Sequence, residues 1–146
     1  MKIKSINIKT KKDNNYINDH SGKIDDYHLD INMSKVGNLN EYQVWIFTRE
    51  GNNTPHFHLQ SKQNDKFIAI KILEPEYFIH GIWKDKLNSK EIKDLINFLN
   101  EKPKGKRGLI YNNNFEFIYD TWEWENNGTD TANIVDMPNY NLLKSK

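Results

Sequence analysis

The sequence predicts an α+β fold, with a small, mostly antiparallel sheet built as a meander and followed by two helices packed on one face. Two observations predict it. Short stretches of alternating apolar and polar residues, joined by turn-rich connections, fill residues 27–73. Beyond them, apolar residues recur at helical spacing in residues 92–99 and again in residues 115–122. Strands first and helices afterwards are typical of the α+β class.

The individual strands follow from alternation. Residues 27–33 carry apolar side chains at every second position, which predicts a half-buried strand, and residues 34–41 are expected to turn the chain. Residues 42–48 are apolar on both faces, which predicts a central strand. Residues 56–61 and 66–73 are expected to complete the meander, because only short turn-forming stretches separate these segments.

The helices are predicted from their ends as well as their apolar stripes. Asn88 is a good N-cap, because its side chain can accept a hydrogen bond from the amide of Glu91, whose carboxylate can reach back. Pro103 follows the apolar stripe and stops this helix. The second helix is expected at about residues 115–125, ended by Asn-Asn-Gly at residues 126–128.

Length and composition limit the class of protein. A chain of 146 residues is the size of one domain, which we divide into a flexible or edge-strand arm (residues 1–26) and a single α+β domain (residues 27–146). An aromatic content of 12% favours a folded core built on large rings. The formal net charge of +1 gives no overall field that attracts nucleic acid or a membrane. Cysteine is absent, which excludes disulfides, thiolate metal sites and a cysteine nucleophile.

The sequence also predicts a cytoplasmic protein that does not enter a membrane. No run approaches the ~18 apolar residues that a spanning helix needs. The basic, alternating N-terminus lacks the apolar core of a signal peptide. Lys, Asn and Ile, whose codons are AT-rich, are abundant, which indicates an AT-rich genome such as those of many bacteria and their phages.

The stretch Pro-His-Phe-His-Leu-Gln, residues 55–60, is the strongest candidate for chemistry. In a strand, alternate side chains share a face, so His56, His58 and Gln60 point one way. Phe57 and Leu59 point the other way and can face the core. We therefore expect the histidine face to be available to solvent, to a ligand or to the neighbouring strand.

A metal site is one interpretation of this face. Two imidazoles at alternate positions of a strand lie ~7 Å apart, close enough to share a divalent ion. The candidates for a third ligand are His80, Glu76, Glu50 and Asp85. In this interpretation the metal ligands are His56, His58 and His80, and a divalent metal is the cofactor. The interpretation that the sequence favours is a pair of ordinary histidines hydrogen-bonded on a hairpin, with no cofactor.

Histidine catalysis is a second interpretation. The run His-Phe-His-Leu-Gln resembles the motif of the nucleotidyl-transferase branch of the histidine-triad superfamily. That resemblance implies catalytic roles for His56 and His58, with His58 attacking an α-phosphate. Arg49, Gln60 or Lys71 would then bind the substrate, the cations by neutralising phosphate charge. The corresponding function is a metal- or histidine-dependent hydrolase or transferase acting on nucleotides or RNA.

A broader resemblance covers residues 42–100. This segment is similar to a group of small bacterial and phage domains of unknown function that occur near toxin–antitoxin modules and in mobile elements. Its specific element is Pro55-His56-Phe57-His58, preceded by Arg49-Glu50. The resemblance implies no established activity.

Two further features are candidates for binding. Lys104, Lys106 and Arg107 form a basic loop that either contacts nucleic-acid phosphates or is a solvated turn. Trp122 and Trp124 point about 200° apart on a helix, so that one is expected in the core. Trp124 is then either an anchor for a partner protein or a cover for the margin of the sheet.

These observations favour a small intracellular regulatory or inhibitory binding protein of a prokaryotic mobile element, of the phage or toxin–antitoxin type. It would act by protein–protein contact with a host or cognate protein. The grounds are its size, its AT-rich bias, the family resemblance and the lack of a complete catalytic set among the motifs. Whether the protein is an enzyme stays open at this point.

Overall fold

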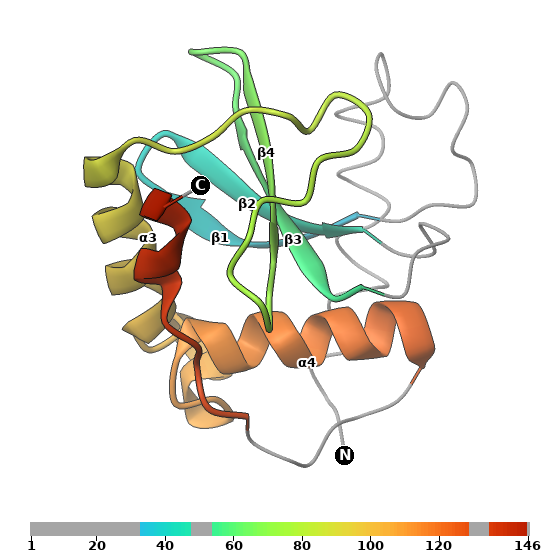
Figure 1. Cartoon of the computed structure of the whole chain (residues 1–146). Coiled ribbons are helices and arrows are strands. Elements are labelled where there is room, and N and C mark those ends of the chain that lie inside the picture. Colours follow the sequence, from blue (N-terminus) through green and yellow to red (C-terminus); the bar gives the residue numbers. More distant parts are fainter. Residues whose placement is uncertain (1–32, 48–53, 129–134, 146) are drawn as a thin grey trace.

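The computed structural model describes residues 33–47, 54–128 and 135–145 (Figure 1). Within them, four antiparallel strands form one sheet in the order β1-β2-β3-β4. The strands are β1 (Met33–Leu39), β2 (Tyr42–Phe47), β3 (His56–Ser61) and β4 (Lys66–Lys71). Strands adjacent in the sequence are adjacent in the sheet, so the predicted meander is confirmed, and with it the α+β class. The predicted arm, residues 1–26, lies outside the described residues.

The first strand departs from the prediction. Residues 34–39 were expected to turn the chain, yet they belong to β1, and most of the strand predicted at residues 27–33 lies outside the described residues. The pairing of β1 with β2 shifts between Lys35 and Gly37, which marks a β-bulge. A bulge inserts one extra residue and interrupts the two-residue alternation on which the prediction relied. The turn itself is confined to Asn40 and Glu41.

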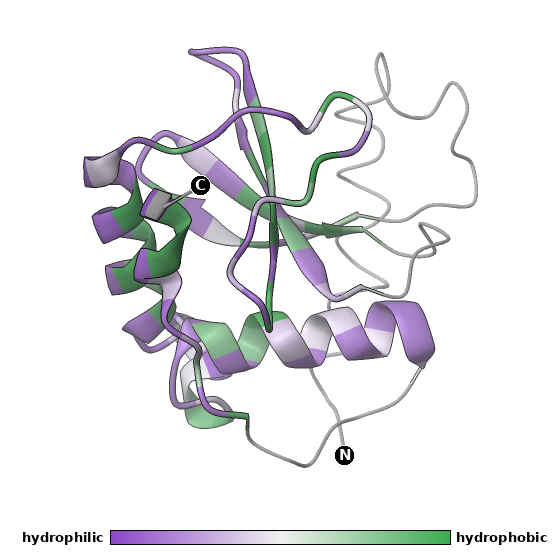
Figure 2. Ribbon diagram, viewed as in Figure 1, coloured by the Kyte–Doolittle hydropathy of each residue, from purple (hydrophilic) through white to green (hydrophobic). Residues whose placement is uncertain are grey.

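One face of the sheet carries the hydrophobic core. Alternate residues of β2, β3 and β4, among them Val44, Leu59 and Ile68, lie opposite one another and are fully buried. Two helices, α3 (Ser89–Asn100) and α4 (Asn114–Asn127), add apolar side chains to the same cluster. Figure 2 shows that the apolar side of α3 is turned inwards and its polar side outwards. The two expected helices are therefore confirmed, with α4 slightly longer than predicted.

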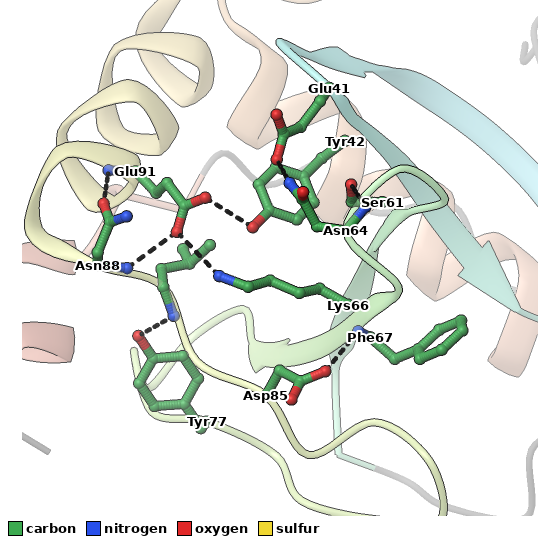
Figure 3. Close-up of polar contacts among 11 residues, drawn as sticks. Glu41, Tyr42, Ser61, Asn64, Lys66, Phe67, Tyr77, Asp85, Asn88 and Glu91 are labelled. Carbon is green, nitrogen blue, oxygen red and sulfur yellow. Dashed lines mark hydrogen bonds and ion pairs between the residues drawn. The ribbon is translucent and has the colours of Figure 1, made fainter.

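The N-terminus of α3 is tied to the sheet by polar contacts (Figure 3). The predicted capping box is present, since Asn88 Oδ1 accepts from Glu91 N at 2.8 Å and Glu91 Oε1 accepts from Asn88 N at 2.9 Å. The second oxygen of Glu91 accepts from Tyr42 Oη at 2.8 Å, and Lys66 Nζ lies 3.9 Å from Oε1. The same carboxylate therefore caps the helix and joins it to β2 and β4.

Two 3₁₀ helices that alternation did not predict complete the described chain. The first, η2 (Gly105–Leu109), links α3 to α4, and the second, η3 (Tyr140–Ser145), lies beside α3 (Figure 1). Tyr140 is fully buried, and its hydroxyl donates to the carbonyl of Ile72 at 2.6 Å. The C-terminal segment therefore packs back onto the sheet.

Residues 72–87, which we call the β4–α3 connection, run back along β4 (Figure 1). Phe78 N donates to Ala69 O at 2.8 Å, and Lys71 N donates to Glu76 O at 2.9 Å. The connection next reverses between His80 and Trp83, with Gly81 in the left-handed region at φ +57°. It then returns to β4 at Asp85, whose amide donates to Phe67 O at 3.0 Å. Because both of its ends are bonded to β4, the turn at residues 80–83 is held in a fixed place.

Candidate metal centre

Strand β3 places His56 and His58 on the face of the sheet opposite the hydrophobic core. Phe57 and Leu59, between and beyond them, belong to the core, as their alternation predicted. In the sheet His58 lies between Trp45 of β2 and Ala69 of β4, and His56 lies beside Lys71. Cross-strand partners point to the same face, so these side chains share it.

The β4–α3 connection brings a third imidazole to this pair. One ring nitrogen from each of His56, His58 and His80 lies within 4.8 Å of the other two. The ring centroids are 4.8 Å apart for His56 and His58, and 5.4 Å apart for each pair with His80. The Nε2 atoms of His58 and His80 are 3.2 Å apart. We call these three residues the histidine cluster.

These distances fit coordination of one ion. Zinc binds imidazole nitrogen at about 2.0–2.1 Å, so two nitrogens on adjacent corners of a tetrahedron lie about 3.3 Å apart. The centroids of imidazoles bound in this way are then about 5 Å apart. The 3.2 Å between Nε2 of His58 and Nε2 of His80 matches that arrangement, as do the ring separations of 4.8–5.4 Å. The three nitrogens as a set lie within 4.8 Å of one another, so the ligand from His56 would move inwards to complete the site.

The protonation of the cluster also suits a metal. The carbonyl of Thr54 can only accept, so His56 Nδ1 donates to it, at 2.7 Å, and in the neutral ring Nε2 is left as the lone-pair nitrogen. Metal-binding histidines commonly hold their second nitrogen against a carbonyl in this way. Burial lowers the pKa of His58 well below its ordinary value of 6.5, and the neighbouring His56 and His80 lower it further. His58 is therefore a neutral imidazole near pH 7, which is the form that binds metal.

Three aromatic side chains enclose the cluster. Their ring centroids lie 4.7 Å (Phe47) and 4.2 Å (Trp83) from that of His58, and 4.5 Å (Phe78) from that of His56. The histidine face was expected to meet solvent, a ligand or the neighbouring strand, and of these it does not meet solvent, since His56 is 2% and His58 1% exposed. Phe47 could have been found by strand alternation, whereas Phe78 and Trp83 lie in a connection whose sequence has no periodicity.

The other candidate ligands are engaged elsewhere or lie outside the described residues. Glu76 is 3.6 Å from Lys71 Nζ, and Asp85 accepts from the amide of Phe67 at 2.9 Å. Among the described residues, the only group of three or more potential ligands is the histidine cluster, and it contains no carboxylate. Glu50 and Arg49 fall in residues 48–53, which the structure does not describe.

The remaining predicted binding residues lie on several elements. Gln60 is buried on the same face of β3 as the histidines. Trp124 is half-buried on α4, while Trp122 is in the core, as one of the two was expected to be. Lys104 and Lys106 are exposed at η2, and the Arg107 guanidinium stacks over Phe117, 4.6 Å from the ring centroid.

Comparison of the chain with protein-family models, with curated proteins and with solved structures found no match. The resemblance of residues 42–100 to toxin–antitoxin-associated domains therefore stays a prediction. Within the described residues, no helix has both the length and the apolar character needed to cross a bilayer.

Proposed function

We propose that the protein binds a divalent transition metal, of the zinc type, through His56, His58 and His80. The observation that carries this proposal is the convergence of three imidazoles, with ring nitrogens within 4.8 Å of one another. Imidazole is a good ligand for Zn²⁺, and the burial of His58 keeps it neutral. Two ligands come from one strand and the third from the fixed turn of the β4–α3 connection, so the donor set is held by rigid elements.

Three histidines leave one tetrahedral position for another ligand, which is the arrangement of catalytic zinc sites. An ion bound there would supply Lewis-acid chemistry, including a bound water with its pKa lowered to about 7. The chain's own residues would exclude bulk water through Phe47, Phe78 and Trp83, and orient His56 through Thr54. An open fourth position with Lewis-acid chemistry supports a hydrolase or a transferase. The resemblance of the histidine motif to nucleotidyl transferases favours nucleotides or RNA as its substrates.

The test is metal content. Protein purified without an affinity tag, and supplied with zinc during growth, should retain about one equivalent of zinc after exhaustive dialysis. His58→Ala and His80→Ala should each lose most of it, because two imidazoles hold the ion far more weakly than three. His80 is only half-buried and lies on a turn, so His80→Ala keeps the test valid if His58→Ala fails to fold.

Gln60→Ala is the matched control, since Gln60 shares the strand, the face and the burial of the two histidines. It should retain the metal. A wild-type protein that neither contains nor takes up zinc, or a His80→Ala variant that keeps a full equivalent, would exclude the metal centre.

A second candidate function is the regulatory or inhibitory binding protein of a mobile element, acting by protein–protein contact. The observation that favours it is the exposure of two large aliphatic side chains beside His80. Ile82 is 62% exposed on the fixed turn, and Ile79, directly before the turn, is 60% exposed. Exposed apolar side chains on a rigid turn are typical contacts for another protein.

Its test is crosslinking in the cells that make the protein, followed by identification of the crosslinked species. Wild-type protein should crosslink to one partner at stoichiometric yield, and a variant with Ile79→Ser and Ile82→Ser should not. Equal crosslinking by both proteins would contradict a contact through this turn.

A further inference from the structure

The histidine cluster provides no negative charge to a bound ion. Its three ligands are imidazoles, each neutral when it binds a metal, and no carboxylate of the described residues belongs to the group. A divalent ion held by these three side chains therefore keeps its full charge of two. This differs from sites with Asp or Glu ligands, where the protein itself neutralises part of the charge.

The surroundings of the cluster make that charge costly. His56 and His58 are almost completely buried, and the rings of Phe47, Phe78 and Trp83 pack around them. A charge surrounded by apolar groups is strongly destabilised unless an opposite charge lies beside it. His80 is half-buried, so this member of the cluster is partly accessible to solvent at the turn of residues 80–83. A fourth ligand would approach the cluster from that side.

Lys71 stands at the edge of this site. It is the cross-strand partner of His56, so its side chain projects from the same face of the sheet. Its Nζ lies 3.8 Å from Glu74 and 3.6 Å from Glu76, both long for ion pairs, and the Glu74 side chain is largely exposed. Pairs of this kind in contact with water are weak. Lys71 can therefore leave them for a stronger anionic partner at the cluster.

We infer that the fourth position of the metal centre takes an oxyanion, a carboxylate or a phosphate group, with one oxygen on the metal and another bound by Lys71. The inference rests on the proposed metal centre and names the chemical class of its ligand. An oxyanion supplies the negative charge that the imidazoles lack, and its second oxygen can accept a charge-assisted hydrogen bond from the Lys71 ammonium.

The experiment uses the full chain loaded with Co²⁺, whose visible absorption bands report the ligands of the ion. Acetate and methyl phosphate are titrated separately, so that the two arms distinguish a carboxylate from a phosphate ligand. Acetamide, which has nearly the same shape as acetate and no charge, is the control ligand. We expect a saturable change of the cobalt bands with at least one of the two anions and none with acetamide.

Lys71→Met should raise the dissociation constant of that anion about tenfold, because a charge-assisted hydrogen bond is lost. The affinity for Co²⁺ itself should be unchanged, which also shows that the variant is folded. Lys66→Met is the matched control, because it removes a lysine at the other end of β4 whose Nζ lies near Glu91 instead. It should leave the titration as it is in the wild type.

The outcomes separate this inference from the metal centre. If Co²⁺ binds with three-histidine spectra and neither anion changes them, the oxyanion site is wrong and the metal centre stands. If Lys71→Met binds the anion as tightly as the wild type, Lys71 has no part in recognition and the inference fails in that respect. If Co²⁺ does not bind, both proposals fail.

Discussion

At the scale of single residues, His58 shows how its neighbours determine the chemistry of an ordinary side chain. Its ring is fully buried between Phe47 and Trp83, and its Nε2 faces Nε2 of His80 at 3.2 Å. Burial and the two neighbouring histidines oppose a positive charge on it, so its pKa lies well below 6.5. A side chain that is half protonated in water at mildly acidic pH is held here as a neutral ligand.

This pKa predicts how stability depends on pH in the metal-free protein. The unfolded chain protonates His58 near pH 6.5, whereas the folded chain does so only at lower pH. The unfolded state therefore holds more protons between these two values, and the free energy of unfolding should fall as the pH drops below 6.5. One such group contributes at most about 1.4 kcal/mol per pH unit. Urea unfolding with a chelator present, at roughly pH 7.5 and pH 5.5, measures the effect.

The control for this prediction is His58→Gln, which removes the titrating group and keeps a polar side chain of similar length. Its free energy of unfolding should fall less between the two pH values than that of the wild type. An identical pH dependence in both proteins would show that the pKa of His58 is not lowered in the folded state.

At the scale of elements, the start of α3 determines where the last part of the β4–α3 connection lies. The connection ends at Leu87, whose amide donates to the Tyr77 hydroxyl at 3.1 Å, and Asn88 then caps the helix (Figure 3). Glu91 bonds both to this cap and to Tyr42 of the sheet. The helix, the connection and the sheet are therefore joined at one point.

Replacing the cap tests this junction. Asn88→Ala removes the acceptor for the amide of Glu91, and the free energy of unfolding should fall by about 1 kcal/mol. Asn88→Ser is the matched control, since a serine hydroxyl can accept the same bond and should retain most of the stability. Chemical denaturation of the three proteins gives the comparison, and an equal loss in both variants would argue against a capping role.

At the scale of the whole molecule, the two faces of the sheet are covered by different parts of the chain. One packs against α3 and α4 and makes the core, while the other carries the histidine cluster under the β4–α3 connection. A metal held by His56, His58 and His80 would join the sheet to the connection, in addition to the backbone bonds along β4. We therefore expect metal binding to stabilise the folded state as a whole and to tighten the connection in particular.

Zinc at a hundredfold excess over its dissociation constant should add about 2.7 kcal/mol, which raises the melting temperature by roughly 5–10 °C for a domain of this size. Hydrogen exchange should slow most at the amides of the turn, such as Trp83 N, which donates to His80 O at 2.9 Å. Differential scanning calorimetry and exchange mass spectrometry, each with zinc and with chelator, measure the two effects.

His80→Ala should abolish both effects, because it removes the ligand that comes from the connection. Exchange in α4 should follow global stability alone and serves as the internal reference. Protection that rises equally in α4 and at the turn would mean that the metal does not act through the connection.

Much of the fold could be predicted because its signals are local. The alternation of residues 56–61 places Phe57 and Leu59 in the core, and the structure confirms β3 over the predicted range. The capping pair Asn88 and Glu91 likewise needs only neighbours three residues apart. The prediction was wrong at β1, where the bulge between Lys35 and Gly37 breaks the two-residue period that identifies a strand.

Local pattern was enough to place β2, β3, β4 and the two α-helices in order, and to divide β3 into a core side and a histidine side. What lies opposite those histidines depends on the packing of a distant segment. His80 is 22 residues from His58, in a connection without periodicity, and it arrives there because the connection bonds back along β4. The same folding back buries imidazoles that alternation alone would have left at the surface. Local pattern reports the direction of a side chain, whereas its neighbours depend on how distant segments pack.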